Sequence, residues 1–138
     1  MNYVTIVILE NKMITKNDHK SLALWAAGRA EKVLPYFEKE NPKDDRPRKA
    51  IEALRAWVKD ELKCGEVRKA AWAAHAAARS AKTDSAIFAA RIAGQAASVA
   101  HVPTHAAGVT YYEEKLAKAK EIDTEKQNRT KLEAQIHN

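Results

Sequence analysis

Residues 70–107 constrain the fold more than any other part of the chain, because alanine dominates this stretch. Alanine is the best helix former, and its small side chain lets helices pack closely. Polar side chains within such a stretch are expected either to be buried and hydrogen-bonded or to serve a function. Six of them stand out, namely His75, Arg79, Arg91, Gln95, His101 and His105. The stretch therefore predicts close-packed helices joined by a polar network.

The rest of the chain also favours helices. Ala, Glu, Lys, Arg and Leu dominate, while the four Gly and four Pro lie mainly at plausible breaks. We predict an all-α protein, with a single compact domain of about five to six helices and Ala-rich central helices over residues 18–138. Residues 1–17 are expected to form an N-terminal lead-in or a short strand, because the β-branched run 3–9 has no evident partner strand.

Apolar spacing and helix-end signals place the individual helices. We expect helices at 19–39, 47–63, 66–81, 85–101, 104–122 and from 124 onward. The expected capping and breaking residues are Asp18, Asp44 or Asp45, Gly65, Thr83 or Asp84, Pro103, and Asp123 or Thr124. The expected core positions of the first two helices are Leu22, Ala26, Ala30, Val33, Phe37, Ile51, Leu54, Val58 and Leu62.

Two polar stripes occur on neighbouring predicted helices. Trp72, His75 and Arg79 share one side of the helix 66–81, whose opposite side is alanine. Trp72 is expected in the core, with Arg79 packing along it. Arg91, Gln95 and Ser98 form a second stripe on the next helix, so the two stripes are expected to pair and to fix the register of the helices.

The histidines also raise the alternative of a small metal-dependent enzyme. His101 and His105 are four residues apart, as two ligands on one helix side would be, and His75 is a candidate third ligand. Pro103 lies between the first two, however, and no acidic ligand or H-E-x-x-H motif accompanies them. We therefore expect structural imidazoles, no metal and no cofactor.

Cysteine content and hydropathy bear on the cellular compartment. Cys64 is the single cysteine, so no internal disulfide can form, which favours a reducing compartment. The apolar run 3–9 is far too short to span a bilayer and lacks the flanks of an export signal. We expect a cytoplasmic protein with no membrane partner.

The net charge of +6 comes from one segment. Residues 46–82 contain ten basic and four acidic side chains, whereas the other parts of the chain are balanced. This asymmetry keeps open a nucleic-acid-associated helical protein as an alternative. No phosphate-binding glycine loop, catalytic triad signature or base-reading aromatic motif occurs, so we expect neither an enzyme nor specific nucleic-acid binding.

The densest charged loop contains Asp44, Asp45, Arg46 and Arg48. Acidic residues at the start of a helix stabilise its positive end, which accounts for the aspartates. Capping does not account for the arginines, whose planar guanidinium groups suit recognition of a partner. We interpret these four residues as a candidate partner-binding site.

Three runs of the sequence resemble a known family: DHKSLALWAAGRAEKVLPYFEKENPKDDRPRKAIEALRAWVKDEL, EVRKAAWAAHAAARSA and AARIAGQAASVAHVPTHAAGVTYY. They are similar to immunity proteins of bacterial polymorphic-toxin systems, the immunity type-five-like family. The resemblance covers about residues 18–112, and its most specific parts are Asp44–Ala53 and Ala73–Arg79. It implies an all-helical cytoplasmic protein that binds and neutralises a cognate protein toxin without catalysis. A homo-oligomer remains an open alternative.

Overall fold

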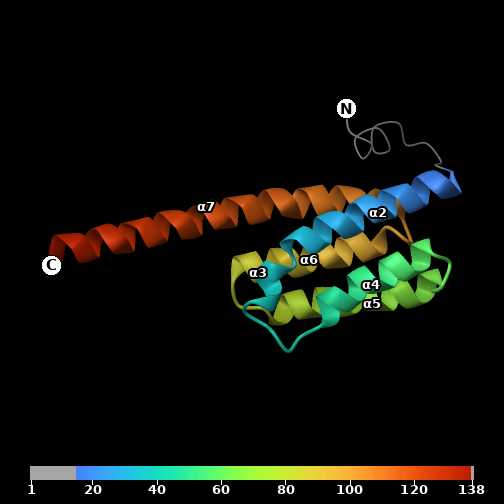
Figure 1. Cartoon of the computed structure of the whole chain (residues 1–138), viewed down its shortest axis with the longest axis horizontal. Helices are drawn as coiled ribbons and strands as arrows, with labels where there is room; N and C mark the ends of the chain where they lie inside the picture. The colour runs from blue at the N-terminus through green and yellow to red at the C-terminus, as the bar shows by residue number, and fades with distance from the viewer. Residues whose placement is uncertain (1–14, 138) are drawn as a thin grey trace.

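The helices of the chain are arranged in two layers (Figure 1). The computed structural model describes residues 15–137, and all regular structure in this range is helical. Its elements are α2 (Lys16–Val33), α3 (Pro35–Glu38), α4 (Arg46–Val58), α5 (Cys64–Ser80), α6 (Asp84–Ser98), the 3-10 turn η1 (Pro103–His105) and α7 (Ala106–His137). The predicted all-α fold is confirmed, and the expected strand at 3–9 lies outside the described residues.

Helix α6 lies at the centre of the fold. It contacts α5 on one side and α7 on the other, and these three helices form one layer. Helices α2 and α4 contact each other and cover the inner side of α6. The outer side of the α5, α6 and α7 layer has no further described helix over it, so polar side chains can lie there at the surface.

Alanine supplies most of the buried surface of α5 and α6. Fully buried alanines include Ala71, Ala74, Ala77, Ala89, Ala93 and Ala96. Of the expected core positions, Leu22, Ala26, Ala30, Phe37, Ile51 and Leu54 are confirmed as buried, while Val33, Val58 and Leu62 are partly buried. Small side chains on both facing helices allow the close packing that their composition predicts.

Two expected helix boundaries near the N-terminus are wrong. Thr15, rather than Asp18, caps α2, because its side-chain oxygen accepts a hydrogen bond from the backbone N–H of Asp18 at 3.1 Å. The expected helix 19–39 is also divided at Leu34, where α2 ends and α3 begins at Pro35. Proline lacks a backbone N–H and its ring crowds the preceding turn, so it favours a new helix start.

The stop expected at Gly65 is wrong, because α4 ends earlier. Asp60 adopts a left-handed conformation with a φ of 61°. The N–H of Asp60 donates to the carbonyl of Trp57 and that of Glu61 donates to the carbonyl of Ala56, at 3.0 and 2.9 Å. This pair of bonds is a Schellman motif, in which aspartate replaces the usual glycine. Gly65 instead lies in the first turn of α5.

The helix break expected at Asp123 or Thr124 is also wrong, since α7 continues through both residues. The hydroxyl of Thr124 donates to the carbonyl of Lys120 at 2.9 Å, so this polar side chain is satisfied within the helix. The break expected near Pro103 is confirmed, because Val102 is extended and Pro103 opens η1. Thr83 caps α6 as expected.

The described helices lack any apolar stretch long enough to cross a membrane.

Candidate functional site

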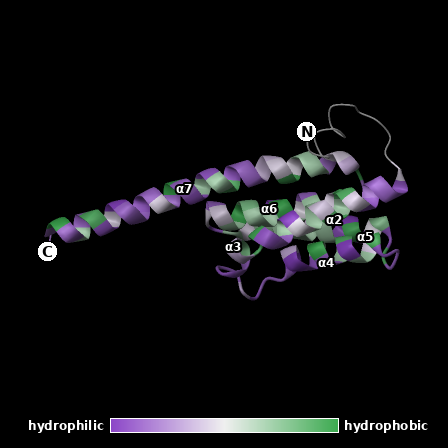
Figure 2. Cartoon of the chain, turned by 45° about the horizontal axis from the view of Figure 1, so that its top comes forward, coloured by the Kyte–Doolittle hydropathy of each residue, from purple (hydrophilic) through white to green (hydrophobic). Residues whose placement is uncertain are grey.

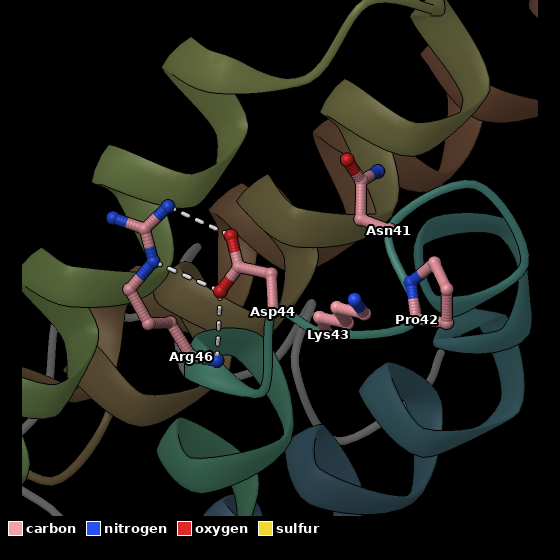
Figure 3. A pocket seen from close by; sticks show the side chains of 5 residues that line it. All are labelled: Asn41, Pro42, Lys43, Asp44 and Arg46. Atoms are coloured by element: carbon pink, nitrogen blue, oxygen red, sulfur yellow. Dashed lines mark hydrogen bonds and ion pairs between the residues drawn. The ribbon is translucent and has the colours of Figure 1, made fainter.

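The candidate site forms a corner where the loop after α3 enters α4 (Figure 3). The carboxylate of Asp44 accepts hydrogen bonds from Nε and Nη2 of Arg46, at 2.9 and 2.7 Å. It also accepts the backbone N–H of Arg46 at 3.1 Å. Of the two aspartates expected to start this helix, Asp44 therefore binds a free N–H group of its first turn. Asp45 holds the N-cap position without such a bond.

This ion pair shifts the ionisation of both partners. The hydrogen bonds from Arg46 lower the pKa of the Asp44 carboxyl below its usual value. The same bonds raise the pKa of Arg46. Bidentate pairing fixes the plane of a guanidinium as well as its position. Arg46 is thus held in one orientation at the corner.

Arg48 has a carboxylate partner from a different element. Its Nε and Nη2 atoms donate to the carboxylate of Glu38 in α3, at 2.8 and 2.5 Å. These bonds lower the pKa of Glu38. The two arginines that capping did not explain are therefore tied to the chain, and Arg48 joins α4 to α3. Asp45 pairs with Lys49 one turn later at 3.3 Å, and both side chains are exposed.

A shallow hollow of about 490 Å³ lies beside this corner, lined by Asn41, Pro42, Lys43, Asp44 and Arg46. Figure 3 shows the guanidinium of Arg46 at its edge, with Lys43 and Pro42 on the loop beyond Asp44. Among the described residues, no hydrogen-bond acceptor is found for Nη1 of Arg46. At this corner, the guanidinium of Arg46 is held in one orientation beside the hollow, and its Nη1 group can still donate hydrogen bonds.

The polar residues of the Ala-rich stretch form two hydrogen-bonded pairs across helices. Nη1 of Arg91 donates to Nδ1 of His75 at 2.9 Å, which joins α6 to α5. Nδ1 of His105 lies 2.9 Å from Oε1 of Gln95 and donates to it, which joins η1 to α6. The pair with Arg91 requires a neutral His75 whose proton is on Nε2. Both pairs occur on the outer side of the three-helix layer.

Burial and nearby positive charge lower the pKa of His75 to about 4. Burial is the largest cause, followed by the charges of Arg91 and Arg79 and of His105. Burial also lowers the pKa of His105, assisted by the charge of His101. Arg79 itself is exposed on α5.

The three histidines considered as metal ligands do not form one site. His75 binds Arg91, His105 binds Gln95, and Nδ1 of His101 lies 3.9 Å from Sγ of Cys64. Within residues 15–137, no three His, Cys, Asp or Glu side chains gather as metal ligands would. The geometry gives the metal-dependent alternative no support.

The expected core position of Trp72 is wrong. Its side chain is 57% exposed, and the guanidinium of Arg68 lies over its ring at 5.0 Å from the centroid. The alanine side of α5 packs inward instead, because Ala71 and Ala74 allow a closer approach to α4 and α6 than an indole would. Large apolar size therefore does not decide which side of this helix is buried.

His19 is a structural residue that the sequence patterns did not single out. Its Nε2–H donates to the carbonyl of Val99 at 2.5 Å, and its ring lies 4.8 Å from that of Trp57. It thereby ties α2 to α4 and to the turn that ends α6. A histidine one turn into an amphipathic helix gives no spacing signal for such a contact.

Two glycines, Gly94 and Gly108, lie against the side chains of the polar pairs. Replacing either with alanine is predicted to lower stability. A Cβ at Gly94 would lie 2.6 Å from the ring of His75, and one at Gly108 would lie 2.5 Å from Cδ of Gln95. We expect Gly94→Ala and Gly108→Ala to displace these side chains and to lower the free energy of unfolding by about 1–2 kcal/mol, since overpacking exceeds the gain in helix propensity. Urea denaturation followed by circular dichroism measures the change.

Gly28 and Gly65 provide the matched controls, because a Cβ at either would meet nothing within 4 Å. We expect Gly28→Ala to raise stability by about 0.5–1 kcal/mol through helix propensity alone. Equal responses at Gly28 and Gly94 would contradict the assignment of Gly94 as a contact point for His75.

A family model described as "Imm-5 like putative immunity protein" matches residues 12–138. The chain belongs to this family. The family that the sequence resembles is thereby confirmed, over a longer range than the three quoted runs. A search of curated proteins and a search of solved structures gave no significant match.

For this Imm-5 like chain, the match includes every described helix from α2 to α7. The corner at Asp44 and Arg46 and the pairs around His75 and Gln95 therefore all lie in the matched region. No part of the described fold is an addition to the family domain.

Proposed function

We propose that this chain is an immunity protein that binds a cognate protein toxin in the cytoplasm and neutralises it without catalysis. The observation that carries the proposal is the family match across residues 12–138. The match spans nearly the whole chain, which supports a role for the complete helical fold rather than for one segment of it. The proposed partner is a protein, with no specific nucleic acid and no membrane involved.

The proposed contact surface is the corner formed by Asp44, Asp45, Arg46 and Arg48. Asp44 and Glu38 hold the two guanidinium groups in place before any partner arrives. Ordering a long side chain on binding costs free energy, so an arginine that is already oriented loses less when it docks. The remaining donors of Arg46 suit backbone carbonyls or carboxylates of a toxin surface.

The polar network has a supporting role in this proposal. His75 with Arg91 and Gln95 with His105 fix how α5, α6 and η1 pack against each other. Buried or half-buried hydrogen-bonded pairs set the register of small-residue interfaces that would otherwise slide. We assign Arg79 and His101 to the edge of this network, and assign a metal to none of its members.

The proposal predicts that a polymorphic-toxin domain is encoded beside this chain's gene, and it is tested by co-expressing that domain with this chain in a bacterial host. Induction of the toxin domain alone is expected to stop growth, and induction together with this chain is expected to restore it. Continued growth arrest, with both proteins folded and soluble at comparable levels, would contradict the immunity function.

We predict that replacing the arginines of the corner affects toxin affinity more than folding stability. We expect Arg46→Ala and Arg48→Ala each to weaken toxin binding about fivefold or more, because an arginine at an interface centre contributes above about 1 kcal/mol. Each change is expected to cost under about 1 kcal/mol of folding stability, since the ion pairs are partly exposed. Isothermal titration and urea denaturation measure the two quantities.

Arg29 is the matched control for these variants. It pairs with Glu113 at 2.8 Å, and its side chain is 48% exposed compared with 49% for Arg48. It lies on α2, outside the corner. Arg29→Ala is expected to bind toxin like the unmodified chain. A loss of affinity as large as that of Arg48→Ala would show a general effect of charge and remove the corner from the interface.

A further inference from the structure

The last part of α7 extends away from the two helix layers (Figure 1). Every residue from Glu121 to His137 is exposed, although the helix is unbroken from Ala106. An isolated helix of this length is marginal in water, because helix stability in proteins comes mainly from packing of one side. Packing against a partner helix would therefore stabilise the extension.

The side of α7 that packs on the other helices is apolar only up to Ala119 and becomes polar in the extension. Val109, Leu116 and Ala119 are buried there. In the extension the same side continues with polar residues such as Asp123 and Thr130. The extension is thus not suited to fold back onto the apolar core of its own chain.

The opposite side of the extension has the apolar residues. Ile122, Leu132 and Ile136 are 52, 57 and 69% exposed. Together with Glu125 and Arg129 they recur at alternating steps of three and four residues, which is the spacing of a helix-pairing seam. Figure 2 shows hydrophobic positions interrupting the hydrophilic ribbon of this segment.

We propose that two copies of the chain dimerise through this side of α7, with the two helices antiparallel. A two-fold axis at Gln127 places Ile122 of one copy against Leu132 of the other. The same axis places Glu125 of one copy against Arg129 of the other, so two opposite-charge pairs flank the centre of the seam, and at each end Ile136 packs along the alkyl chain of Lys118. In a parallel pair each of these charges would face its own like charge, which disfavours that arrangement.

The geometry leaves room for the second copy. The seam is on the side of α7 turned away from Val109 and Leu116, so neither copy's helix layers obstruct the other. Overlap from residue 118 to residue 136 makes a contact about 28 Å long, at 1.5 Å per residue. Such a contact buries on the order of 1,000 Å² in total, at the lower limit for a specific interface. The dimer is therefore concentration-dependent.

The test is the mass of the full-length chain in solution, measured by sedimentation equilibrium from low to high micromolar concentration. The average mass is expected to rise from 15.4 kDa towards twice that value. A mass of 15.4 kDa at every concentration would overturn the proposal.

Substitutions on the exposed helix locate the contact without disturbing the fold. Ile122→Lys combined with Leu132→Lys is expected to weaken dimerisation about a hundredfold or more, because the seam loses both of its Ile122–Leu132 pairs. Leu24→Lys, at an exposed leucine on α2, is the matched control and should keep the dimer. A dimer that persists in the double lysine variant, or is lost in the control, would place the contact elsewhere.

Charge exchange tests the antiparallel register. Arg129→Glu alone should weaken the dimer, since Glu125 of one copy then faces a second glutamate. Combining it with Glu125→Arg restores the opposite-charge contact and should recover the original affinity. Failure of the double exchange to recover the affinity lost by the single change would overturn the register. Circular dichroism of each variant confirms unchanged helix content.

Discussion

Replacing Phe37 with alanine is expected to lower the free energy of unfolding by about 3–5 kcal/mol. Phe37 is fully buried, and the other buried residues of its cluster are all alanines, with Val33, Ala81 and Ile87 partly buried at the edge: Ala77, Ala78, Ala86, Ala89 and Ala90. Alanine side chains are too short to fill the space that the ring leaves, so the cavity remains open. Since the whole domain is stable by about 5–15 kcal/mol, urea denaturation followed by circular dichroism would record a large shift.

The neighbouring Tyr36 supplies the control for this prediction. It is exposed, and Lys120 lies 4.9 Å from the centre of its ring. Tyr36→Ala is expected to cost less than about 1 kcal/mol, because it leaves no cavity. Similar losses for the two aromatic residues would contradict the account of an alanine core filled by a single large ring at this end.

Lowering the pH from 6.5 to 4 is expected to remove about 1–2 kcal/mol of stability through His75, because solvent screens part of the effect at this half-buried side chain. The unfolded chain takes up this proton below its ordinary pKa of 6.5, whereas the folded chain keeps His75 neutral until a pKa of about 4. The unfolded state thus binds more protons in this range and gains stability as the pH falls. The lowered pKa of His105 acts in the same direction.

Variants at His75 and at its partner test this prediction. His75→Gln removes the titrating group and should flatten the dependence of stability on pH between 6.5 and 4. Arg91→Gln removes a positive charge that lowers the pKa of His75, so it should reduce the slope by a smaller amount. Urea denaturation at a series of pH values measures both slopes. An unchanged slope in His75→Gln would contradict the assignment.

Sequence patterns predicted the elements whose signals are local. The spacing of Leu22, Ala26 and Phe37 identified buried positions, and Thr83 and Pro103 marked true helix boundaries. Each of these signals depends on the residue itself and on neighbours within one or two turns. Such information is fully contained in the sequence.

The errors arose where tertiary packing decides between two local options. On α5, the larger Trp72 was expected inside, but close packing buried the alanine side instead. At the end of α4, Asp60 took the left-handed position expected of a glycine, and it also pairs with Lys20 of α2 at 2.7 Å. Neither choice follows from residue preferences alone, because each depends on which helix lies opposite.

The candidate corner also combines a contact that is local in the sequence with one that depends on tertiary packing. The sequence drew attention to Arg46 and Arg48 because helix capping explained only the aspartates. It did not supply Glu38, which lies ten residues from Arg48 and reaches it only because α3 and α4 meet at the loop. The pair of Arg46 with Asp44, two residues away, is a local contact that the sequence contained. The partner-binding role of the corner stays a prediction.

The immunity function is tested most directly by mixing the purified chain with the purified toxin domain that the proposal expects to be encoded beside its gene. Isothermal titration is expected to show an equimolar complex with a dissociation constant in the nanomolar range or below, and the complex should lack toxin activity. Absence of binding between two folded proteins, or a complex in which the toxin stays fully active, would contradict the account.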